Sequence, residues 1–362
     1  MKHLTIILTL MLAVAAGSTP AAAATAPPFL TALGIAVPPE LVITDQATDN
    51  NDIELIDLDQ RARRALLDGV VDVYYDYNED GSIDEIIGID TSIWIEGVKP
   101  LQGDLSLILF RFEYGDGGCS TIGIYNSAGQ RLDYLDNGPH SSTEYYDIDE
   151  AHTHTSISHI TKLIFTADTR FELTATMTQK RSFTAPDGSI NEWGQPNYVT
   201  TNEVVDWELT KIYHYAIGKD GHITLKQISG PERKGDVPDR FLKRDAINDI
   251  YYYPANDAER VKKLDLVIQQ PHYYDADDSD EWHYHFRDAT MQVYLNNPSI
   301  FLEYIIANPT SLKLIDMLFE AVGDSLLPKE KLLDDIGRLP DAKHRQYLEK
   351  MTSQWGPKDA VG

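Results

Sequence analysis

The clearest fold signal in the chain is the segment from Leu105 to Tyr125, which reads LSLILFRFEYGDGGCSTIGIY. Two runs rich in β-branched and aromatic residues, Leu105 to Tyr114 and Ser120 to Tyr125, flank the glycine-rich stretch Gly115-Asp116-Gly117-Gly118. Runs of this composition favour strands, and a short connection containing glycine favours an antiparallel hairpin. The segment therefore predicts two paired β-strands.

The same texture continues on both sides of this hairpin. Other strand candidates alternate with turn signals such as Pro186-Asp187-Gly188 and Lys219-Asp220-Gly221. These candidates are Val70 to Tyr75, Ile86 to Ile89, Ile160 to Phe165, Phe171 to Gln179, Val204 to Ala216 and His222 to Lys226. Strands that follow one another through short turns pair in antiparallel fashion. We therefore expect an antiparallel, sandwich-like β-rich domain over residues 60–230, opened by a two-turn helix from Gln60 to Leu67 that Asp59 caps.

Helical spacing dominates the C-terminal residues. Proline stands where a helix would begin at Pro298, Pro309, Pro328 and Pro340, and Asn297 and Asn308 can cap the first two helices. We predict four short helices that form a small all-α domain over residues 295–362. The fold class expected for the whole chain is α+β.

Residues 231–294 are mixed in pattern and are expected to form a linker region. The stretch from Ile228 to Asp239 is rich in Gly, Pro and charged residues, as linkers are. Ala258 to Ile268 predicts a helix. Trp282 to Phe286, in which aromatic and polar residues alternate, predicts a strand.

The N-terminus has the three parts of a bacterial secretory signal. Lys2 supplies a positive charge, Leu4 to Ala16 form an apolar stretch, and Ala21 to Ala24 offer a cleavage site. We expect a signal peptide over residues 1–23, followed by a loosely ordered acidic lead-in over residues 24–59. The single cysteine, Cys119, lies far from the cleavage region, which argues against a lipoprotein. The expected location is the periplasm or the extracellular medium.

The charge balance restricts the partners. Lys and Arg number 31 against 57 Asp and Glu, which gives a formal net charge of −26. Such a surface repels nucleic-acid phosphates and anionic headgroups, and no stretch after the signal has the ~20 apolar residues of a membrane helix. We therefore expect neither nucleic-acid binding nor membrane insertion. Divalent cations and basic proteins are the better partners.

One loop carries recognisable chemistry, namely Asp76-Tyr77-Asn78-Glu79-Asp80-Gly81-Ser82-Ile83-Asp84. Oxygen-bearing side chains occupy every second position, and Gly81 stands where the chain must turn sharply. This alternation lets a tight loop surround one hard cation. We expect a structural calcium ion, with side-chain ligands from Asp76, Asn78, Asp80 and Asp84 and a backbone ligand from Ser82.

Over about ten residues this loop resembles calcium loops of the EF-hand type and the Asp-x-Asn-x-Asp-Gly loops in β-hairpins of integrin-like repeat proteins. An EF-hand carries a bidentate Glu at the twelfth loop position, where this chain has Ile87. The flanking residues are also strand-like. The resemblance therefore implies a calcium-bearing β-hairpin.

Two His-x-His pairs offer a different metal site. They are His152-Thr153-His154 and His283-Tyr284-His285, each with acidic residues nearby. On a strand both histidines of a pair share one face, as zinc and copper sites require. The simpler interpretation is a solvated face, because burial of Trp282, Tyr284 and Phe286 would leave the second pair in solvent.

We interpret the chain as an exported, acidic, calcium-stabilised binding protein whose partner is a protein or a glycan. Its twenty tyrosines suit either kind of recognition. One alternative is a metal-dependent hydrolase that uses the two histidine pairs. A second is a periplasmic inhibitor or immunity-type protein, whose acidic stretch from Asp275 to Glu281 would cover a basic enzyme.

The calcium loop generates a direct prediction. Calcium at a hundred times its dissociation constant should stabilise the mature protein by about 2.7 kcal/mol. Asp80→Ala should abolish this effect, whereas Asp187→Ala, at another acidic turn, should leave it intact. Calorimetric titration and thermal melting measure both. If calcium does not change the melting temperature of the unaltered protein, the predicted calcium site is wrong.

Overall fold

The structure is a computed structural model that describes most of the chain. The described residues are 26–43, 55–67, 73–77, 83–87, 92–114, 117–136, 138–148, 153–191, 193–254, 256–269, 279–323 and 326–354. The expected signal peptide lies outside them, as do residues 44–54 of the expected acidic lead-in. The lead-in was wrongly expected to be loosely ordered throughout, because Pro28–Ala32 and Pro39–Leu41 are helical and bury Leu30 and Leu41. Among the described helices, none is long and apolar enough to cross a membrane.

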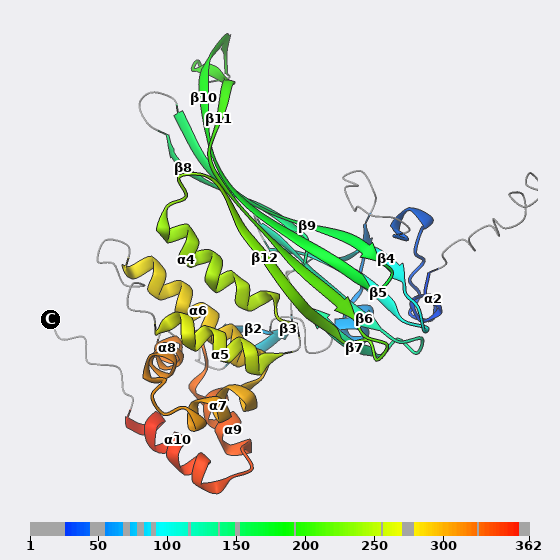
Figure 1. Cartoon of the computed structure of the whole chain (residues 1–362), viewed down its shortest axis with the longest axis vertical. Helices are drawn as coiled ribbons and strands as arrows, with labels where there is room; N and C mark the ends of the chain where they lie inside the picture. The colour runs from blue at the N-terminus through cyan, green and yellow to red at the C-terminus, as the bar shows by residue number, and fades with distance from the viewer. Residues whose placement is uncertain are drawn as a thin grey trace, which may run out of the picture.

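Two twisted five-stranded antiparallel sheets pack against each other, and a helical domain contacts the second sheet (Figure 1). The predicted α+β class is therefore confirmed, with a β-rich sandwich followed by an all-α C-terminal region. The strands predicted between Leu105 and Lys226 fall in the two five-stranded sheets, and the predicted C-terminal helices fall in the helical domain.

The first sheet has the strand order β1-β4-β5-β6-β7. Its strands are β1 (Ile56–Asp57), β4 (Ser92–Pro100), β5 (Ser106–Tyr114), β6 (Gly117–Tyr125) and β7 (Arg131–Leu135). The segment Leu105 to Tyr125 forms its centre as the predicted hairpin of β5 and β6. Leu107 and Leu109 of β5 pack against the second sheet, whereas Ile108 and Phe110 pack on the opposite face. Because both faces are covered, the strand is almost continuously apolar.

The N-terminal helices cover that opposite face. They are α2 (Pro28–Ala32), the 3-10 helix η1 (Pro39–Leu41) and α3 (Gln60–Leu67). Helix α3 has the predicted bounds, and Asp59 caps it by accepting a hydrogen bond from the backbone N–H of Ala62 at 2.7 Å. Tyr125, which is fully buried, donates its hydroxyl to the Leu66 carbonyl at 2.5 Å. The helix end is thereby tied to the sheet.

The second sheet has the strand order β12-β11-β10-β9-β8. Its strands are β8 (His140–Ile148), β9 (Thr153–Ala167), β10 (Arg170–Ile190), β11 (Pro196–Ile217) and β12 (Ile223–Gly235). These strands are longer than the sequence predicted. The predicted turn at Pro186-Asp187-Gly188 is instead an irregularity in the pairing of β10, and the chain reverses between Asn191 and Gln195. The predicted linker from Ile228 onward is also wrong, since β12 continues to Gly235.

The helical domain contains seven α-helices and one 3-10 helix among the described residues. They are α4 (Asp239–Asn248), η2 (Asp249–Tyr252), α5 (Asp257–Ile268), α6 (Ser279–Asn296), α7 (Pro298–Ala307), α8 (Leu312–Gly323), α9 (Lys329–Arg338) and α10 (Ala342–Gln354). The last four are the predicted tandem helices. Asn297 caps α7 as expected, but Asn308 ends that helix instead of starting the next.

The predicted strand from Trp282 to Phe286 is wrong, because these residues lie in α6. Among the described side chains of this helix, the buried ones recur at a spacing of three and four residues; they are Phe286, Arg287, Ala289, Thr290, Val293 and Tyr294. The five residues that alternate between aromatic and polar are too short a window to distinguish a strand from the first turns of a helix.

A matched pair of glycine substitutions tests the packing around Tyr125. A Cβ on Gly123 would lie 2.6 Å from a ring carbon of Tyr125, so Gly123→Ala should lower the free energy of unfolding by about 1–3 kcal/mol. Gly337, in α9, has no heavy atom within 4 Å of an added Cβ, so Gly337→Ala should be neutral or stabilising. Urea unfolding measures both. Equal effects at the two positions would contradict the predicted packing.

Candidate functional site

The predicted calcium loop begins and ends on two described strands, but its central residues 78–82 are outside the described residues. Strands β2 (Val73–Tyr77) and β3 (Ile83–Ile87) pair in antiparallel fashion, which confirms strand-like flanks. Asn78, Asp80 and Ser82 lie in the part between them that is not described. Asp76 and Asp84 stand directly opposite each other in the ladder. Among the described residues, no group of three or more His, Cys, Asp or Glu could hold a metal ion.

The two histidine pairs lie on different kinds of element. His154 lies on β9, opposite Ser182 of β10, while His152 is outside the described residues. His283 and His285 lie on α6. Residues two apart on a helix do not share a face, so the shared-face argument for this pair does not hold. The acidic residues from Asp275 to Asp278 also fall outside the described residues.

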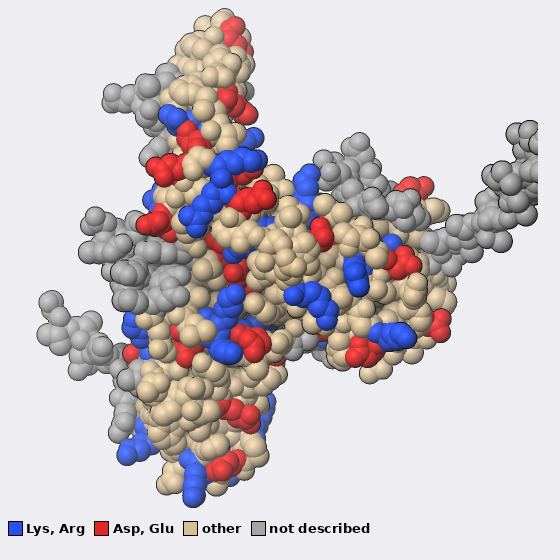
Figure 2. All heavy atoms as spheres, viewed as in Figure 1, with Lys and Arg blue, Asp and Glu red and all other residues tan. Residues whose placement is uncertain are grey.

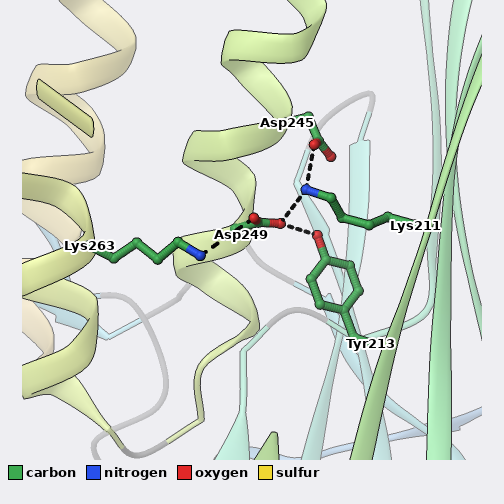
Figure 3. A network of polar contacts seen from close by, with 5 residues as sticks. All are labelled: Lys211, Tyr213, Asp245, Asp249 and Lys263. Atoms are coloured by element: carbon green, nitrogen blue, oxygen red, sulfur yellow. Dashed lines mark hydrogen bonds and ion pairs between the residues drawn. The ribbon is translucent and has the colours of Figure 1, made fainter. Parts of the chain in front are cut away.

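A buried polar network joins the second sheet to the helical domain (Figure 3). Lys211 of β11 forms ion pairs with Asp245 of α4 and, at 2.8 Å, with Asp249 of η2. Tyr213 donates its hydroxyl to Asp249 at 2.5 Å, and Lys263 of α5 lies 3.6 Å from the same carboxylate. Two lysines therefore balance two carboxylates. Since the Lys211 side chain is only 7% exposed, each charge depends on its partners.

Burial sets the electrostatics of this network. Desolvation raises the pKa of Asp245 above its usual value, and the charge of Lys211 opposes that shift. Desolvation also raises the pKa of Tyr213, and the neighbouring Asp249 adds to the effect. Tyr213 therefore stays protonated and donates its hydrogen bond. The network acts as a clamp between sheet and helices, and the Tyr213 ring stacks on Tyr252 at 3.7 Å beside it.

A second buried ion pair joins the sandwich to the helices. Arg260 of α5, whose side chain is 1% exposed, lies 2.8 Å from Asp136, which follows β7. Its Nε donates to the Tyr253 carbonyl at 2.5 Å. Burial raises the pKa of Asp136, and Arg260 opposes this shift. Both ion pairs hold the helical domain against the β-strands.

Strands β10 and β11 continue beyond the rest of their sheet as a two-stranded ribbon. Among the described residues, the last pair with β9 is Phe183 and Thr153, and the last pair with β12 is Trp207 and Gly235. Beyond them, in the part of the chain that the structure describes, β10 and β11 pair only with each other, and Figure 1 shows the ribbon projecting from the body at the top of the view. We call residues 184–206 the arm.

The base of the arm is fixed by polar and aromatic contacts. Arg181 holds both carboxylate oxygens of Asp206 at 2.8 Å, which lowers the pKa of that carboxyl. The indole N–H of Trp207 donates to the Gln179 side chain at 2.9 Å. The Trp207 ring also packs on Phe241 of α4, with centroids 4.6 Å apart. The ribbon is thus anchored where it leaves the sheet.

The arm carries an unusual share of the exposed apolar surface. Thirteen large apolar side chains are exposed among the described residues, and six of them belong to the arm. They are Ile190, Trp193, Tyr198, Val199, Val204 and Val205. Trp193, which is 77% exposed, lies in the turn. The Asn191 side chain accepts hydrogen bonds from the backbone N–H groups of Trp193 and Gln195, so this turn has a defined shape.

The arm is also free of positive charge. No Lys or Arg occurs between Arg181 and Lys211, whereas Asp187, Glu192 and Glu203 are acidic. Figure 2 shows the upper end of the projection as uncharged and acidic atoms, with basic atoms starting below it.

Sequence reasoning missed the arm because it ended one strand at Gln179 and began the next at Val204. The absence of Lys and Arg between Arg181 and Lys211 is a feature of the sequence that could have indicated a distinct element there. The network around Lys211 had no comparable signal, because its partners lie more than thirty residues away in the chain.

Searches against protein-family models, curated proteins and solved structures give no significant match to this chain. Function is therefore inferred from the exposure, contacts and charge of the described residues.

Lys211→Met tests the clamp. The substitution leaves Asp245 and Asp249 buried without their nearest cation, so the free energy of unfolding at pH 7 should fall by about 3–5 kcal/mol. The pKa of Asp245, already raised by burial, should rise further without Lys211. A carboxyl whose folded pKa lies above its unfolded value of about 3.9 destabilises the fold progressively as pH rises from the unfolded to the folded value. The loss of stability caused by Lys211→Met should therefore shrink as pH falls through that window.

Urea unfolding at pH 7 and pH 5 measures this change. Lys234→Met, which removes an exposed lysine paired with Glu208 on the same sheet, serves as the control and should leave stability nearly unchanged. If Lys211→Met lowers the free energy of unfolding only slightly, or lowers it more at pH 5 than at pH 7, the proposed role of the Lys211 network is wrong.

Proposed function

We propose that this is an exported, acidic binding protein that recognises a partner protein through the arm. The observation that carries the proposal is the concentration of exposed apolar side chains on a projecting two-stranded ribbon. A two-stranded ribbon has no core of its own, and clustered exposed apolar groups on a soluble protein mark interaction sites. Trp193 at the turn is the residue type that most often dominates binding energy at interfaces.

The charge of the arm indicates the chemistry of the partner. Acidic residues without any Lys or Arg favour a surface that combines apolar and basic groups. Phosphate-rich partners and anionic membranes are disfavoured for the same reason. Aromatic side chains suit glycan recognition, whereas four of the six exposed apolar residues on the arm are aliphatic. A protein is therefore the favoured partner.

An inhibitor or immunity-type role is a specific version of this proposal. A narrow projecting acidic ribbon has the shape and charge to enter a basic cleft of an enzyme. A hydrolase that depends on the two histidine pairs has less support, because the second pair lies on a helix.

Calcium remains part of the proposal as a structural ligand of the hairpin of β2 and β3. Asp76 and Asp84 are directly opposed in the ladder, so the register brings two residues of the expected ligand set to the same end of the hairpin. An extracellular calcium site needs only weak affinity to be filled, which agrees with an address in the periplasm or the medium.

Site-specific photo-cross-linking tests the arm in the producing bacterium. A photoreactive phenylalanine analogue replaces Tyr198 of the arm, which is 42% exposed, in one variant. In a control variant it replaces Tyr347 of α10, which is 41% exposed. We expect a discrete cross-linked partner from position 198 and none from position 347. Adding Glu203→Lys should reduce the yield, because it reverses an arm charge. No product from position 198, or the same products from both positions, would refute the proposal.

A further inference from the structure

The second sheet has one covered face and one open face. The covered face packs on the first sheet and on helix α4, and it carries Leu173, Tyr213 and Trp207. Side chains on a strand alternate between faces, so Glu172 and His214 lie on the other side. Ile160 and Ile164 on that side are more than a third exposed. We call this side the open face.

Three side chains from three adjacent strands meet on the open face. They are Glu172 of β10, His214 of β11 and Ser229 of β12. The ladder pairs Glu172 with His214 directly, and it pairs Ser229 with Ile212, so Ser229 lies diagonally across from the histidine. His214 Nδ1 lies 3.0 Å from Glu172 Oε1, and His214 Nε2 lies 2.9 Å from Ser229 Oγ. His214 and Glu172 retain about 30% side-chain exposure.

The contacts from Glu172 to His214 to Ser229 can activate the Ser229 hydroxyl as a nucleophile. A carboxylate that accepts the Nδ1 proton fixes the tautomer in which Nε2 carries the lone pair. Nε2 then accepts the hydrogen bond from the Ser229 hydroxyl. Nucleophile, base and orienting carboxylate at these distances define the arrangement that hydrolases of unrelated folds share.

We propose that Ser229 and His214 form an acyl-transfer site that hydrolyses small neutral carboxylic esters, with Glu172 as a positioning residue. The site lies away from the residues that carry the arm proposal, and it uses none of them. It also differs from the metal-dependent chemistry expected from the histidine pairs.

The backbone beside Ser229 is shaped by a glycine. Gly230 has φ +98°, and a Cβ there would lie 2.8 Å from the Thr210 carbonyl oxygen, so only glycine fits. A register shift in the pairing of β11 with β12 occurs at the same place. Irregularities of this kind re-aim a side chain at the edge of a sheet. Here the side chain is Ser229, and β12 is the edge strand.

A neutral N–H donor lies at the point of attack. Gln227 Nε2 donates to Ser229 Oγ at 3.1 Å. Within the proposal, we assign this amide the role of donor to the oxygen that becomes negative when Oγ bonds to a carbonyl carbon.

The proposed reaction has two balanced steps. Ser229 Oγ forms a bond to the ester carbonyl carbon while its proton passes to His214 Nε2. The bond to the leaving alcohol then breaks, and that alcohol takes the proton from His214. Water attacks the resulting acyl-serine with His214 again as base. The carboxylic acid is released, and Ser229 regains its proton. No metal or cofactor is consumed or required.

The surroundings define the substrate class. The acidic chain disfavours anionic acyl groups. Thr176 and Thr210, hydrogen-bonded to each other at 3.3 Å, make the neighbouring surface polar. Short neutral acyl esters therefore fit best.

Ester hydrolysis and active-serine labelling test the site on the full mature chain. The probes are p-nitrophenyl acetate and a fluorophosphonate, which phosphonylates an activated serine with loss of fluoride. We expect labelling at Ser229 and turnover that falls at least about 100-fold in Ser229→Ala and in His214→Asn. Glu172→Gln should lower kcat with KM unchanged. Thermal melting establishes that each variant is folded.

Ser158→Ala is the matched control. Ser158 lies on the same open face and donates to the Thr178 carbonyl, so it should retain full labelling at Ser229 and full turnover. Labelling that is absent from Ser229 in the folded protein would overturn the proposal. So would hydrolysis that is equal in Ser229→Ala and Ser158→Ala.

Discussion

The buried contact between Lys211 and the carboxylates of Asp245 and Asp249 is the constraint on which the arrangement of this protein depends. Lys211 lies in the C-terminal half of β11, the longest described strand, and its partners lie on α4 and η2 at the start of the helical domain. Charges this deeply buried are stable only when paired. Sheet and helices therefore cannot separate at this point without exposing both signs of charge.

This clamp explains why the arm can project. Toward one end, β11 is held by the first sheet through Tyr213 and Tyr215. Toward the other, Trp207 and the Arg181–Asp206 pair attach it to α4 and β10. The two strands beyond these contacts extend from a fixed base. A ribbon that is rigid at its root loses less conformational freedom on binding than a free loop would.

Local signals predicted much of the fold. The hairpin of β5 and β6, the helix from Gln60 to Leu67 and its cap at Asp59 all depend on residues close together in the chain, and all are confirmed. Helix α6 was missed because the five alternating residues from Trp282 to Phe286 fit both the two-residue period of a strand and the 3.6-residue period of a helix. The arm was missed because Pro186-Asp187-Gly188 has turn composition but sits within a strand whose partners override it.

The candidate sites were harder to predict, because they depend on register. Glu172, His214 and Ser229 are far apart in sequence, and a shift of one residue in the register of their strands would place them on different faces of the sheet. The calcium loop, in contrast, is a local pattern, and it remains a prediction.

Shortening the arm tests most directly the claim that it serves binding and not folding. Residues 187–197 would be replaced by Asn-Gly, a two-residue turn that closes a hairpin. Thermal melting and partner cross-linking from the exposed face of the remaining ribbon would then be compared with those of the intact chain. The account predicts a melting temperature within a few degrees of the original and loss of the partner. A large fall in melting temperature, or an undiminished partner, would contradict it.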